Sequence, residues 1–229
     1  MKNPLSSASA VLAAASFEQA AQAIVDASLH IYQRGWAPAT SSNFSLRLDE
    51  AHCAITVSGK DKGRLRREDV MQVDFSGQAV NEVCAAGMDK RKPSAETLLH
   101  TQLYRRDAAI GAILHTHSLN ATLISMSATG REDALLLEGL ELLKAFAGTD
   151  SHLAVLRIPI LDNTQDISTL AREVDAAMDQ HGTGHVYLIR GHGIYTWGRD
   201  MNEAMRHLEA IEYLLEYSWR SRVNNQQVI

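Results

Sequence analysis

Apolar residues recur at helical spacing in several segments of the chain. From Ala20 to Ile31 an apolar side chain appears every three or four positions, and Gly35 follows, which predicts a helix over residues 17–34 with one face against a core. A further helix is predicted to begin at Pro93-Ser94, with Ser94 as its N-cap. The same spacing predicts other helices over residues 120–126, 138–146, 167–178 and about 200–222.

Shorter apolar runs with alternating polarity separate these helices. Between residues 43 and 48, Phe44, Leu46 and Leu48 fall on one face of an extended chain and polar residues fall on the other. The runs 70–75 and 78–83 flank Ser76-Gly77 and predict a hairpin. Further strands are predicted over residues 53–57, 111–114, 155–160, 186–189 and 194–197.

Length and composition favour one globular domain spanning residues 1–229. The sequence is 45% hydrophobic and has no linker or repeat, although residues 1–16 are expected to be mobile and residues 224–229 to form a frayed tail. It shows no secretory pattern and no run of roughly 18 apolar residues, so we expect a cytoplasmic protein without a membrane partner. Cys53 and Cys84 are unclustered, which predicts reduced thiols.

The net charge of -5 argues against a general nucleic-acid partner. Basic residues nevertheless gather at positions 60–67 and 90–92. We favour a solvated face over a phosphate-attracting rim as their explanation. Before the first of these runs, the Ser58-Gly59 turn allows backbone N–H groups to approach an anion closely.

Two histidines two positions apart, His115 and His117, follow the predicted buried strand 111–114. Side chains at positions i and i+2 of a strand point the same way, so both imidazoles can share one metal ion. Alone, the pair is equally consistent with two partly exposed histidines. A catalytic divalent ion commonly adds a distant third ligand and keeps an open position. His192, between Gly191 and Gly193, is the best distant candidate.

Two glutamates are candidates for acid-base chemistry. Glu96 could serve only to complement the dipole at the start of a helix, or it could share one face with His100 four residues later and face a common site. Glu141 could be a surface partner of Lys144, or it could carry a proton during catalysis.

Six motifs together resemble the class II aldolase/adducin head family of metal-dependent sugar-phosphate enzymes over nearly the whole chain. They are Thr40-Ser41-Ser42-Asn43-Phe44-Ser45, Ser58-Gly59, Pro93-Ser94-Ala95-Glu96 followed by His100, His115-Thr116-His117, and residues 159–164 and 190–198. Two positions depart from the family pattern. Ser42 stands where the aldolases usually have glycine, and Ala95 replaces a serine that helps to bind phosphate.

The resemblance, taken with the predicted elements, implies a single α/β/α sandwich with a mainly antiparallel central sheet, assembled as a homotetramer. It implies one Zn²⁺ per subunit, held by His115, His117 and His192. It also implies a substrate phosphate site, to which we add Lys60 for its position; the residues are Asn43, Ser58, Gly59, Lys60 and Ser94.

The implied activity is a zinc-dependent lyase reaction of methionine salvage. Water would leave 5-methylthioribulose 1-phosphate to give 2,3-diketo-5-methylthiopentyl 1-phosphate, with the ion polarising the C2 carbonyl and a carboxylate moving the C3 proton to the departing C4 hydroxyl. We favour Glu141 for that carboxylate and Glu96 for a supporting or ligand role beside the metal. The alternatives are a sugar-phosphate aldolase or epimerase on the same fold and, more distantly, a non-catalytic interaction module like the adducin head.

Overall fold

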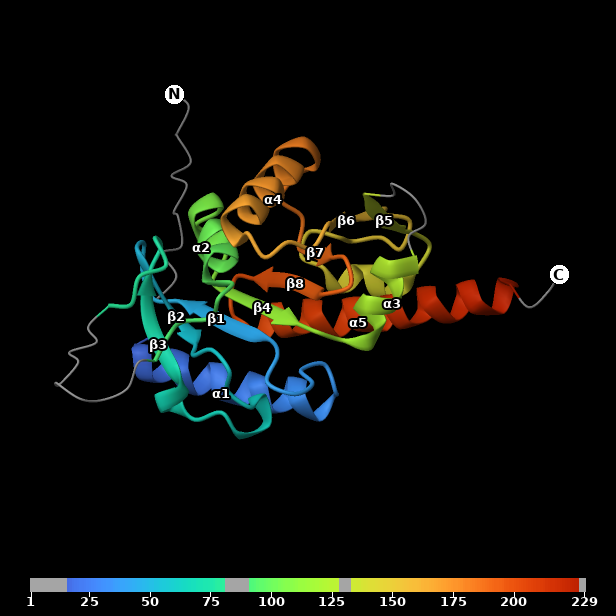
Figure 1. The fold of residues 1–229 in the computed structure, drawn as a ribbon. Coiled ribbons are helices and arrows are strands. Elements are labelled where there is room, and N and C mark those ends of the chain that lie inside the picture. The colour runs from blue at the N-terminus through green and yellow to red at the C-terminus, as the bar shows by residue number, and fades with distance from the viewer. Residues whose placement is uncertain (1–15, 81–90, 128–132, 227–229) are drawn as a thin grey trace, which may run out of the picture.

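The computed structural model describes residues 16–80, 91–127 and 133–226. Its eight described strands form one sheet in the order β3-β2-β1-β4-β8-β7-β6-β5 (Figure 1). The described neighbours pair antiparallel except β6 and β7, which are parallel. The strands are β1 (Asn43–Arg47), β2 (His52–Thr56), β3 (Val70–Asp74), β4 (Ala112–Thr116), β5 (Ala134–Leu137), β6 (Leu156–Leu161), β7 (Val186–Ile189) and β8 (Gly193–Gly198).

Helices cover both faces of this sheet. In Figure 1, α2 and α4 lie on one face, and α1 and α5 lie on the other. The predicted α/β/α sandwich with a mainly antiparallel sheet is therefore confirmed. The helices are α1 (Phe17–Gln33), α2 (Thr97–Arg106), α3 (Leu119–Ser127), α4 (Ile167–His181) and α5 (Met201–Gln226), with short 3-10 turns η1 (Lys62–Arg64), η2 (Arg67–Asp69) and η3 (Glu141–Ala145).

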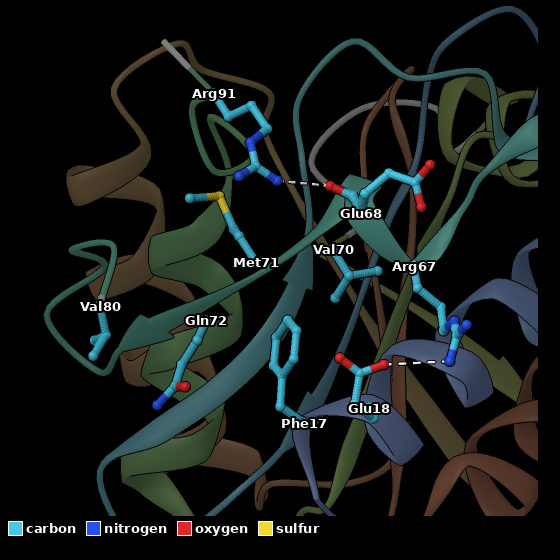
Figure 2. A pocket seen from close by; sticks show the side chains of 9 residues that line it. All are labelled: Phe17, Glu18, Arg67, Glu68, Val70, Met71, Gln72, Val80 and Arg91. Carbon is cyan, nitrogen blue, oxygen red and sulfur yellow. Dashed lines mark hydrogen bonds and ion pairs between the residues drawn. The ribbon is translucent and has the colours of Figure 1, made fainter. Parts of the chain in front are cut away.

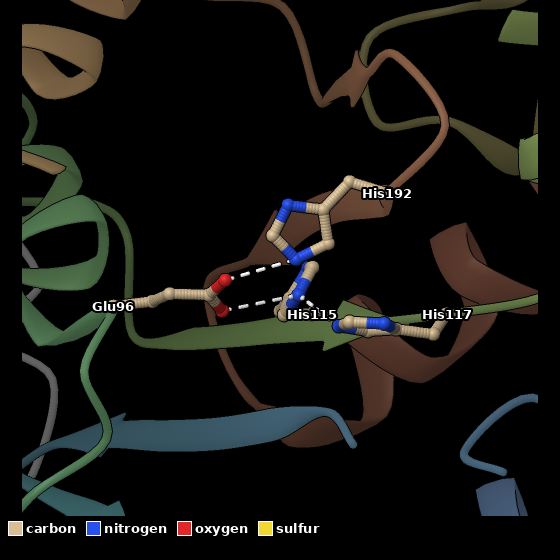
Figure 3. A group of neighbouring side chains, drawn as sticks. All are labelled: Glu96, His115, His117 and His192. Atoms are coloured by element: carbon tan, nitrogen blue, oxygen red, sulfur yellow. Dashed lines mark hydrogen bonds and ion pairs between the residues drawn. The ribbon is translucent and has the colours of Figure 1, made fainter. Parts of the chain in front are cut away.

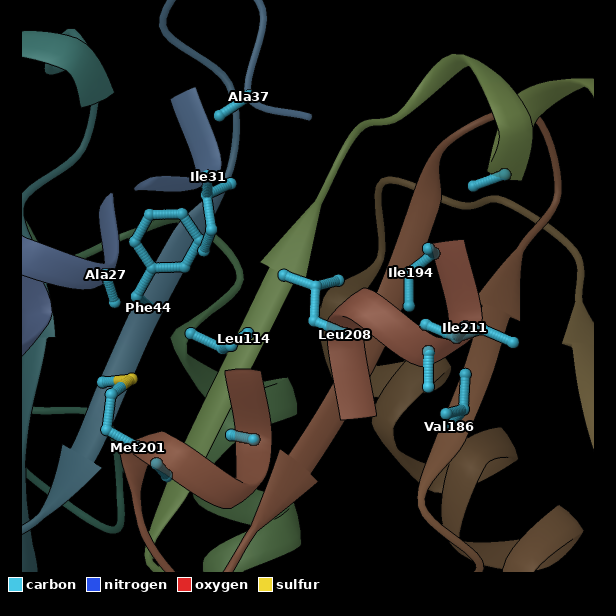
Figure 4. Packing of buried hydrophobic residues seen from close by; sticks show 14 of the residues in the cluster. Ala27, Ile31, Ala37, Phe44, Leu114, Val186, Ile194, Met201, Leu208 and Ile211 are labelled. Atoms are coloured by element: carbon cyan, nitrogen blue, oxygen red, sulfur yellow. The ribbon is translucent and has the colours of Figure 1, made fainter. Parts of the chain in front are cut away.

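Alternation along the central strands supplies one apolar core on each face. On β4, Leu114 points into the core shared with α1 and α5, whereas its neighbour Ile113 points into the core shared with α2 and α4. Figure 4 shows the first of these cores, where Phe44 and Leu114 from the sheet meet Leu208 of α5. Because β4 is buried on both sides, its carboxyl end is a rigid support for the residues that follow.

The helix predicted to begin at Ser94 begins three residues later. Pro93 forms a β-bridge with Val57 next to β2, so the chain is still extended there, and α2 starts at Thr97 with Glu96 in the N-cap position. The prediction of Ser94 as N-cap is therefore wrong. The Ser94 hydroxyl instead accepts a hydrogen bond from the Glu96 N–H at 3.3 Å.

The helix predicted over residues 138–146 is also wrong. Gly139 adopts a positive φ of 73°, which interrupts a right-handed helix, and only the short turn η3 follows. Strand β5 precedes it and was not predicted. The hairpin after β3 begins as expected, because the Val80 N–H donates to the Gln72 carbonyl, but residues 81–83 lie outside the described part.

At the chain ends, α5 continues to Gln226, four residues beyond the predicted end at residue 222. Of the expected frayed tail, only residues 227–229 lie outside the described part, as do residues 1–15 of the expected mobile start. Cys53 is buried and unbridged, and burial raises the pKa of its thiol far above the usual range, whereas Cys84 falls outside the description. Among the described helices, none is long and apolar enough to cross a membrane.

Candidate metal centre

Three separate parts of the sheet meet at the carboxyl end of β4. His115 is on β4 itself and lies opposite Asn43 of β1 on one side and Tyr195 of β8 on the other. His117 follows two residues later. His192 lies in the tight turn between β7 and β8, where its backbone N–H donates to the Ile189 carbonyl at 3.0 Å. The strand order thus brings a residue from position 192 next to a pair at positions 115 and 117.

Glu96 completes this group from the start of α2. The side chains of Glu96, His115, His117 and His192, called here the histidine-glutamate cluster, each offer one ligand atom, and these atoms lie within 4.8 Å of one another (Figure 3). The two Glu96 oxygens lie 3.1 Å from His115 Nε2 and 2.9 Å from His192 Nε2. His115 Nε2 is also 2.8 Å from His117 Nε2.

The hydrogen bonds of His115 fix which nitrogen faces the cluster. Its Nδ1 lies 2.8 Å from the Ile194 carbonyl oxygen, which can only accept, so Nδ1 carries a proton and Nε2 is the nitrogen that faces the cluster. A backbone carbonyl holding the outer nitrogen in this way is the usual arrangement around a metal-binding imidazole. Three imidazoles and one carboxylate are also suitable ligands for Zn²⁺, whose bonds to histidine nitrogen are about 2.0–2.1 Å long. The cluster therefore fits a divalent metal ion.

The protonation states of His117 and Glu96 are also suited to binding a metal ion. Burial, together with the charges of His115 and His192, lowers the pKa of His117 to about 3, so this imidazole is neutral at pH 7 and can bind a metal. Burial alone would raise the pKa of Glu96. The charges of His115 and His192 and their hydrogen bonds to the carboxylate outweigh burial and hold this pKa well below its usual range.

A chain of buried polar side chains orients the Glu96 carboxylate. Its Oε2 accepts hydrogen bonds from Asn43 Nδ2 at 2.8 Å and from the Tyr195 hydroxyl at 3.0 Å. The amide oxygen of Asn43 contacts His100 Nε2, and His100 Nδ1 lies 2.7 Å from the Ser45 hydroxyl. The sequence predicted that Glu96 and His100 share one helix face and one site. In the structure the two side chains are connected indirectly, because each contacts the Asn43 side chain.

Tyr195 was missed by the sequence reasoning. It lies opposite His115 on the neighbouring strand, and its ring stacks on the His115 imidazole with centroids 4.1 Å apart. The alternation of β8 could have placed Tyr195 on one face of that strand. Nothing in the sequence, however, indicated that β8 pairs with β4.

The residues predicted to bind phosphate occupy two neighbouring places. Asn43 and Ser94 both contact Glu96. Ser58 and Gly59 form the turn after β2, where Gly59 adopts a φ of 74° and the Ser58 N–H donates to the Lys92 carbonyl. Their phosphate role, and that of Lys60, remains a prediction.

Glu141 stands apart from the histidine-glutamate cluster in the described subunit. Its side chain is 73% exposed, and it pairs with Lys144 on the same turn, with His152 Nδ1 at 3.9 Å. The Glu141–Lys144 surface pair therefore exists. Neither that pair nor the exposure tests whether this carboxylate takes part in catalysis, so its acid-base role remains a prediction.

Most of the described basic residues near positions 60–67 lie on the surface in ion pairs with nearby carboxylates. Arg67, for example, pairs with Glu18 at 3.3 Å. Both residues line a cavity of about 560 Å³, which is shown in Figure 2. Arg91 lines the same cavity and donates a hydrogen bond to the Glu68 carbonyl oxygen. The cavity lining shares no residue with the histidine-glutamate cluster. Among the basic residues at positions 60–67, Lys62 differs from the others because it is buried, with only 1% of the residue exposed. Lys90 lies outside the described residues.

Residues 22–219 match the family described as Class II Aldolase and Adducin N-terminal domain, so the chain belongs to this family. At the level of individual proteins, it is 52% identical over 201 residues to the methylthioribulose-1-phosphate dehydratase of Stenotrophomonas maltophilia (strain R551-3), covering 88% of this chain and 90% of that protein. It is 51% identical over 199 residues to the protein of the same name from Pseudomonas aeruginosa (strain UCBPP-PA14), covering 87% and 93%.

Solved structures confirm the fold. The L-fuculose-1-phosphate aldolase of Thermus thermophilus matches with a TM-score of 0.70 at 23% identity, over 90% of this chain and 96% of that one. A second L-fuculose 1-phosphate aldolase matches with a TM-score of 0.72 at 22% identity, over 91% and 88%. At these identities the likeness concerns the fold alone.

Proposed function

We propose that this chain is a metal-dependent lyase that removes water from 5-methylthioribulose 1-phosphate and yields 2,3-diketo-5-methylthiopentyl 1-phosphate, a step of methionine salvage. The main supporting observation is the histidine-glutamate cluster, in a chain about half identical to proteins named methylthioribulose-1-phosphate dehydratase along most of their length. A structural role alone would not require three imidazoles to converge on one carboxylate in a partly buried site.

In this proposal His115, His117 and His192 bind the metal, which is Zn²⁺, one per subunit, and Glu96 lies beside it. A bound zinc ion would supply Lewis-acid polarisation of the substrate carbonyl, which is worth several kcal/mol. The identity of the metal is tested by measuring metal content after purification without added metal. Less than half an equivalent of zinc, with another divalent ion near one equivalent, would contradict the zinc assignment.

Side chains of this protein are proposed to orient the Glu96 carboxylate and to transfer the C3 proton of the substrate. Asn43 and Tyr195 hold the Glu96 carboxylate in one orientation, which keeps its charge next to the imidazoles. Glu141 is proposed to take the proton from C3 and return it to the C4 hydroxyl, so that C4 loses water and the remaining enol becomes the diketone. Such general acid-base transfer typically contributes about 10² to 10⁴ in rate. Glu96 is proposed to stay ionised beside the metal, in a supporting or ligand role, because its contacts with His115 and His192 hold its pKa below the usual range.

The substrate phosphate is proposed to lie between the Ser58-Gly59 turn and the start of α2, with Asn43, Lys60 and Ser94 nearby. Backbone N–H groups of a glycine turn favour an anion. The Lys60 ammonium lies 2.9 Å from Asp69 and would have to share its charge with that carboxylate.

A homotetramer in the cytoplasm is part of the same proposal. Large apolar side chains are exposed on α3, α5 and the segment before β6, which is typical of surfaces that another subunit covers. The most exposed among the described residues are Leu119, Met126, Leu153, Val155 and Tyr213, together with Leu136 of β5, between 58% and 74% exposed. Light scattering after size-exclusion chromatography should give four times the chain mass of 25.2 kDa. A monomer at micromolar concentration would contradict this assembly.

The reaction itself is tested by following zinc-loaded protein and 5-methylthioribulose 1-phosphate by NMR. Dehydration gives one diketone phosphate with all the carbon atoms of the substrate. Two smaller fragments would instead identify an aldolase, and a stereoisomer would identify an epimerase. Unchanged substrate with fully metallated protein would refute the dehydratase assignment.

A further inference from the structure

Two histidines outside the metal centre hold both polar groups of one backbone residue, Ala147. The Ala147 N–H donates to His207 Nε2 at 3.1 Å, and the Ala147 carbonyl oxygen accepts from His185 Nε2 at 2.8 Å. The centroids of the two imidazole rings are 4.7 Å apart. His185 and His207 are called here the histidine clamp. A residue in an irregular segment is thus fixed by two side chains from distant parts of the chain.

The hydrogen bonds of the clamp require a defined proton position on each ring. The Ala147 N–H can only donate, so His207 Nε2 accepts and His207 Nδ1 carries the proton that is donated to the Trp197 carbonyl oxygen at 2.7 Å. Burial lowers the pKa of His207 to about 4, so this ring is neutral at pH 7. On His185 the proton is on Nε2, because the Ala147 carbonyl oxygen needs a donor.

The clamped residue directly follows the turn that carries Glu141. Two apolar side chains of this segment, Leu143 and Phe146, are buried in the core. The Phe146 ring stacks against both clamp imidazoles, with centroids 5.2 Å and 6.2 Å away. Glu141, in contrast, is exposed and pairs with Lys144 of the same turn. The position of the Glu141 carboxylate therefore depends on how the turn η3 is held.

The clamp connects this turn to the two strands that border the metal centre. His207 donates to the carbonyl of Trp197 on β8, the strand that also carries Tyr195. His185 immediately precedes β7, and the turn between β7 and β8 carries His192. The place of η3 relative to the metal centre is consequently set through the same strands that position the metal-binding side chains.

We propose that His185 and His207 are positioning residues, which hold η3 where Glu141 can exchange a proton with the substrate. This inference rests on the proposed function, because it takes Glu141 to be the acid-base group. Proton transfer requires the two heavy atoms to lie within about 2.6–3.2 Å of each other. A displacement of about 1 Å can cost about 100-fold in rate. Loss of the clamp should therefore reduce turnover and leave substrate binding nearly unchanged.

The test compares substitutions that keep or remove one arm of the clamp in zinc-loaded, full-length protein. His207→Gln places an amide oxygen near the position of Nε2 and can still accept from Ala147. His207→Asn is too short to reach Ala147 but can still donate to the Trp197 carbonyl. These two amides differ by one methylene group and form a matched pair. His185→Asn removes the other arm at a partly buried position and serves as a second variant in which folding is less at risk.

We expect His207→Asn and His185→Asn to lower kcat by about 10- to 100-fold and to change KM by less than about twofold. His207→Gln should remain within about threefold of wild type in both constants. Amide hydrogen exchange gives a readout without substrate. The Ala147 N–H should exchange faster in His207→Asn and as slowly as in wild type in His207→Gln. All measurements are made well below the melting temperature, with zinc content determined for each variant.

A double substitution tests whether the clamp acts through Glu141. In the Glu141→Gln protein, His207→Asn should lower the remaining turnover by less than about twofold, because the proton-transferring carboxylate is already absent. An equal loss with and without Glu141 would overturn the proposal. So would a wild-type kcat in both His207→Asn and His185→Asn, or a loss in His207→Gln as large as that in His207→Asn.

The same set of proteins separates this inference from the proposed reaction. If zinc-loaded wild-type protein gives no diketone phosphate, the reaction assignment fails. If wild type dehydrates the substrate and Glu141→Gln does not, but the clamp variants turn over like wild type, the reaction stands and this inference fails. If Glu141→Gln itself turns over normally, dehydration stands, whereas the acid-base role of Glu141 and this inference both fail.

Discussion

Glu212 offers a quantitative test of the packing behind the metal centre. This carboxyl on α5 is 2% exposed and receives hydrogen bonds from Ser118, the residue after His117, and from Asn120. Burial raises its pKa from 4.5 to about 7, against the smaller lowering effect of those hydrogen bonds. In the folded protein the group therefore keeps its proton to a much higher pH than in the unfolded chain.

The sign of the effect on stability follows from this difference. Between pH 4.5 and 7 the unfolded chain has released the proton and the folded protein still holds it, so the free energy of unfolding falls as the pH rises. At about 1.4 kcal/mol per pKa unit, the loss is about 3 kcal/mol and is complete above pH 7. Glu212→Gln has a similar shape and cannot ionise, so this part of the pH dependence should disappear.

The assay is denaturant unfolding of wild-type and Glu212→Gln protein at several pH values between 4.5 and 8. The stability of the variant relative to wild type should increase by about 3 kcal/mol across that range. Glu173→Gln, a change at an exposed position on α4, serves as control and should follow the wild-type curve. A constant difference between Glu212→Gln and wild type at all pH values would refute the reasoning, because it would mean that Glu212 ionises alike in both states.

Two further substitutions address the chemistry and the strand pairing. Glu141→Gln should keep zinc and fold but lower turnover by about 10² to 10⁴, whereas Glu138→Gln on the same exposed segment should not; near-normal turnover of Glu141→Gln would remove this residue from the mechanism. Gly193→Ala places a methyl group 2.0 Å from the Thr116 carbonyl oxygen, so β8 must shift away from β4. We expect a lower melting temperature and reduced zinc retention, and an unchanged protein would contradict the described pairing.

Local patterns were enough to predict the elements that carry the histidines. The apolar run before His115 and the glycines around His192 determine the local structure at those positions, and both are confirmed. The helix predicted over residues 138–146 failed because one glycine, Gly139, adopts a positive φ that apolar spacing does not reveal.

The contacts around the cluster depend on pairings between distant parts of the chain. Tyr195 meets Glu96 only because β8 pairs with β4, and Lys62 is buried only because η1 packs on α1, where Ser28 donates to the Lys62 carbonyl. In the sequence, Lys62 is one of several basic residues in a row and nothing distinguishes it from Lys60. Burial, rather than residue type, separates the two lysines.

The most direct test of the central claim is a zinc titration of metal-free protein with the formation of the diketone phosphate followed at each step. The proposed site predicts that activity rises in proportion to bound zinc and levels off at one zinc per subunit, and that His192→Ala, which removes one of the three imidazoles, neither retains zinc at that level nor gains activity. Full dehydration by the metal-free protein, or a His192→Ala protein that binds zinc and turns over like wild type, would contradict the claim that this cluster holds the catalytic metal.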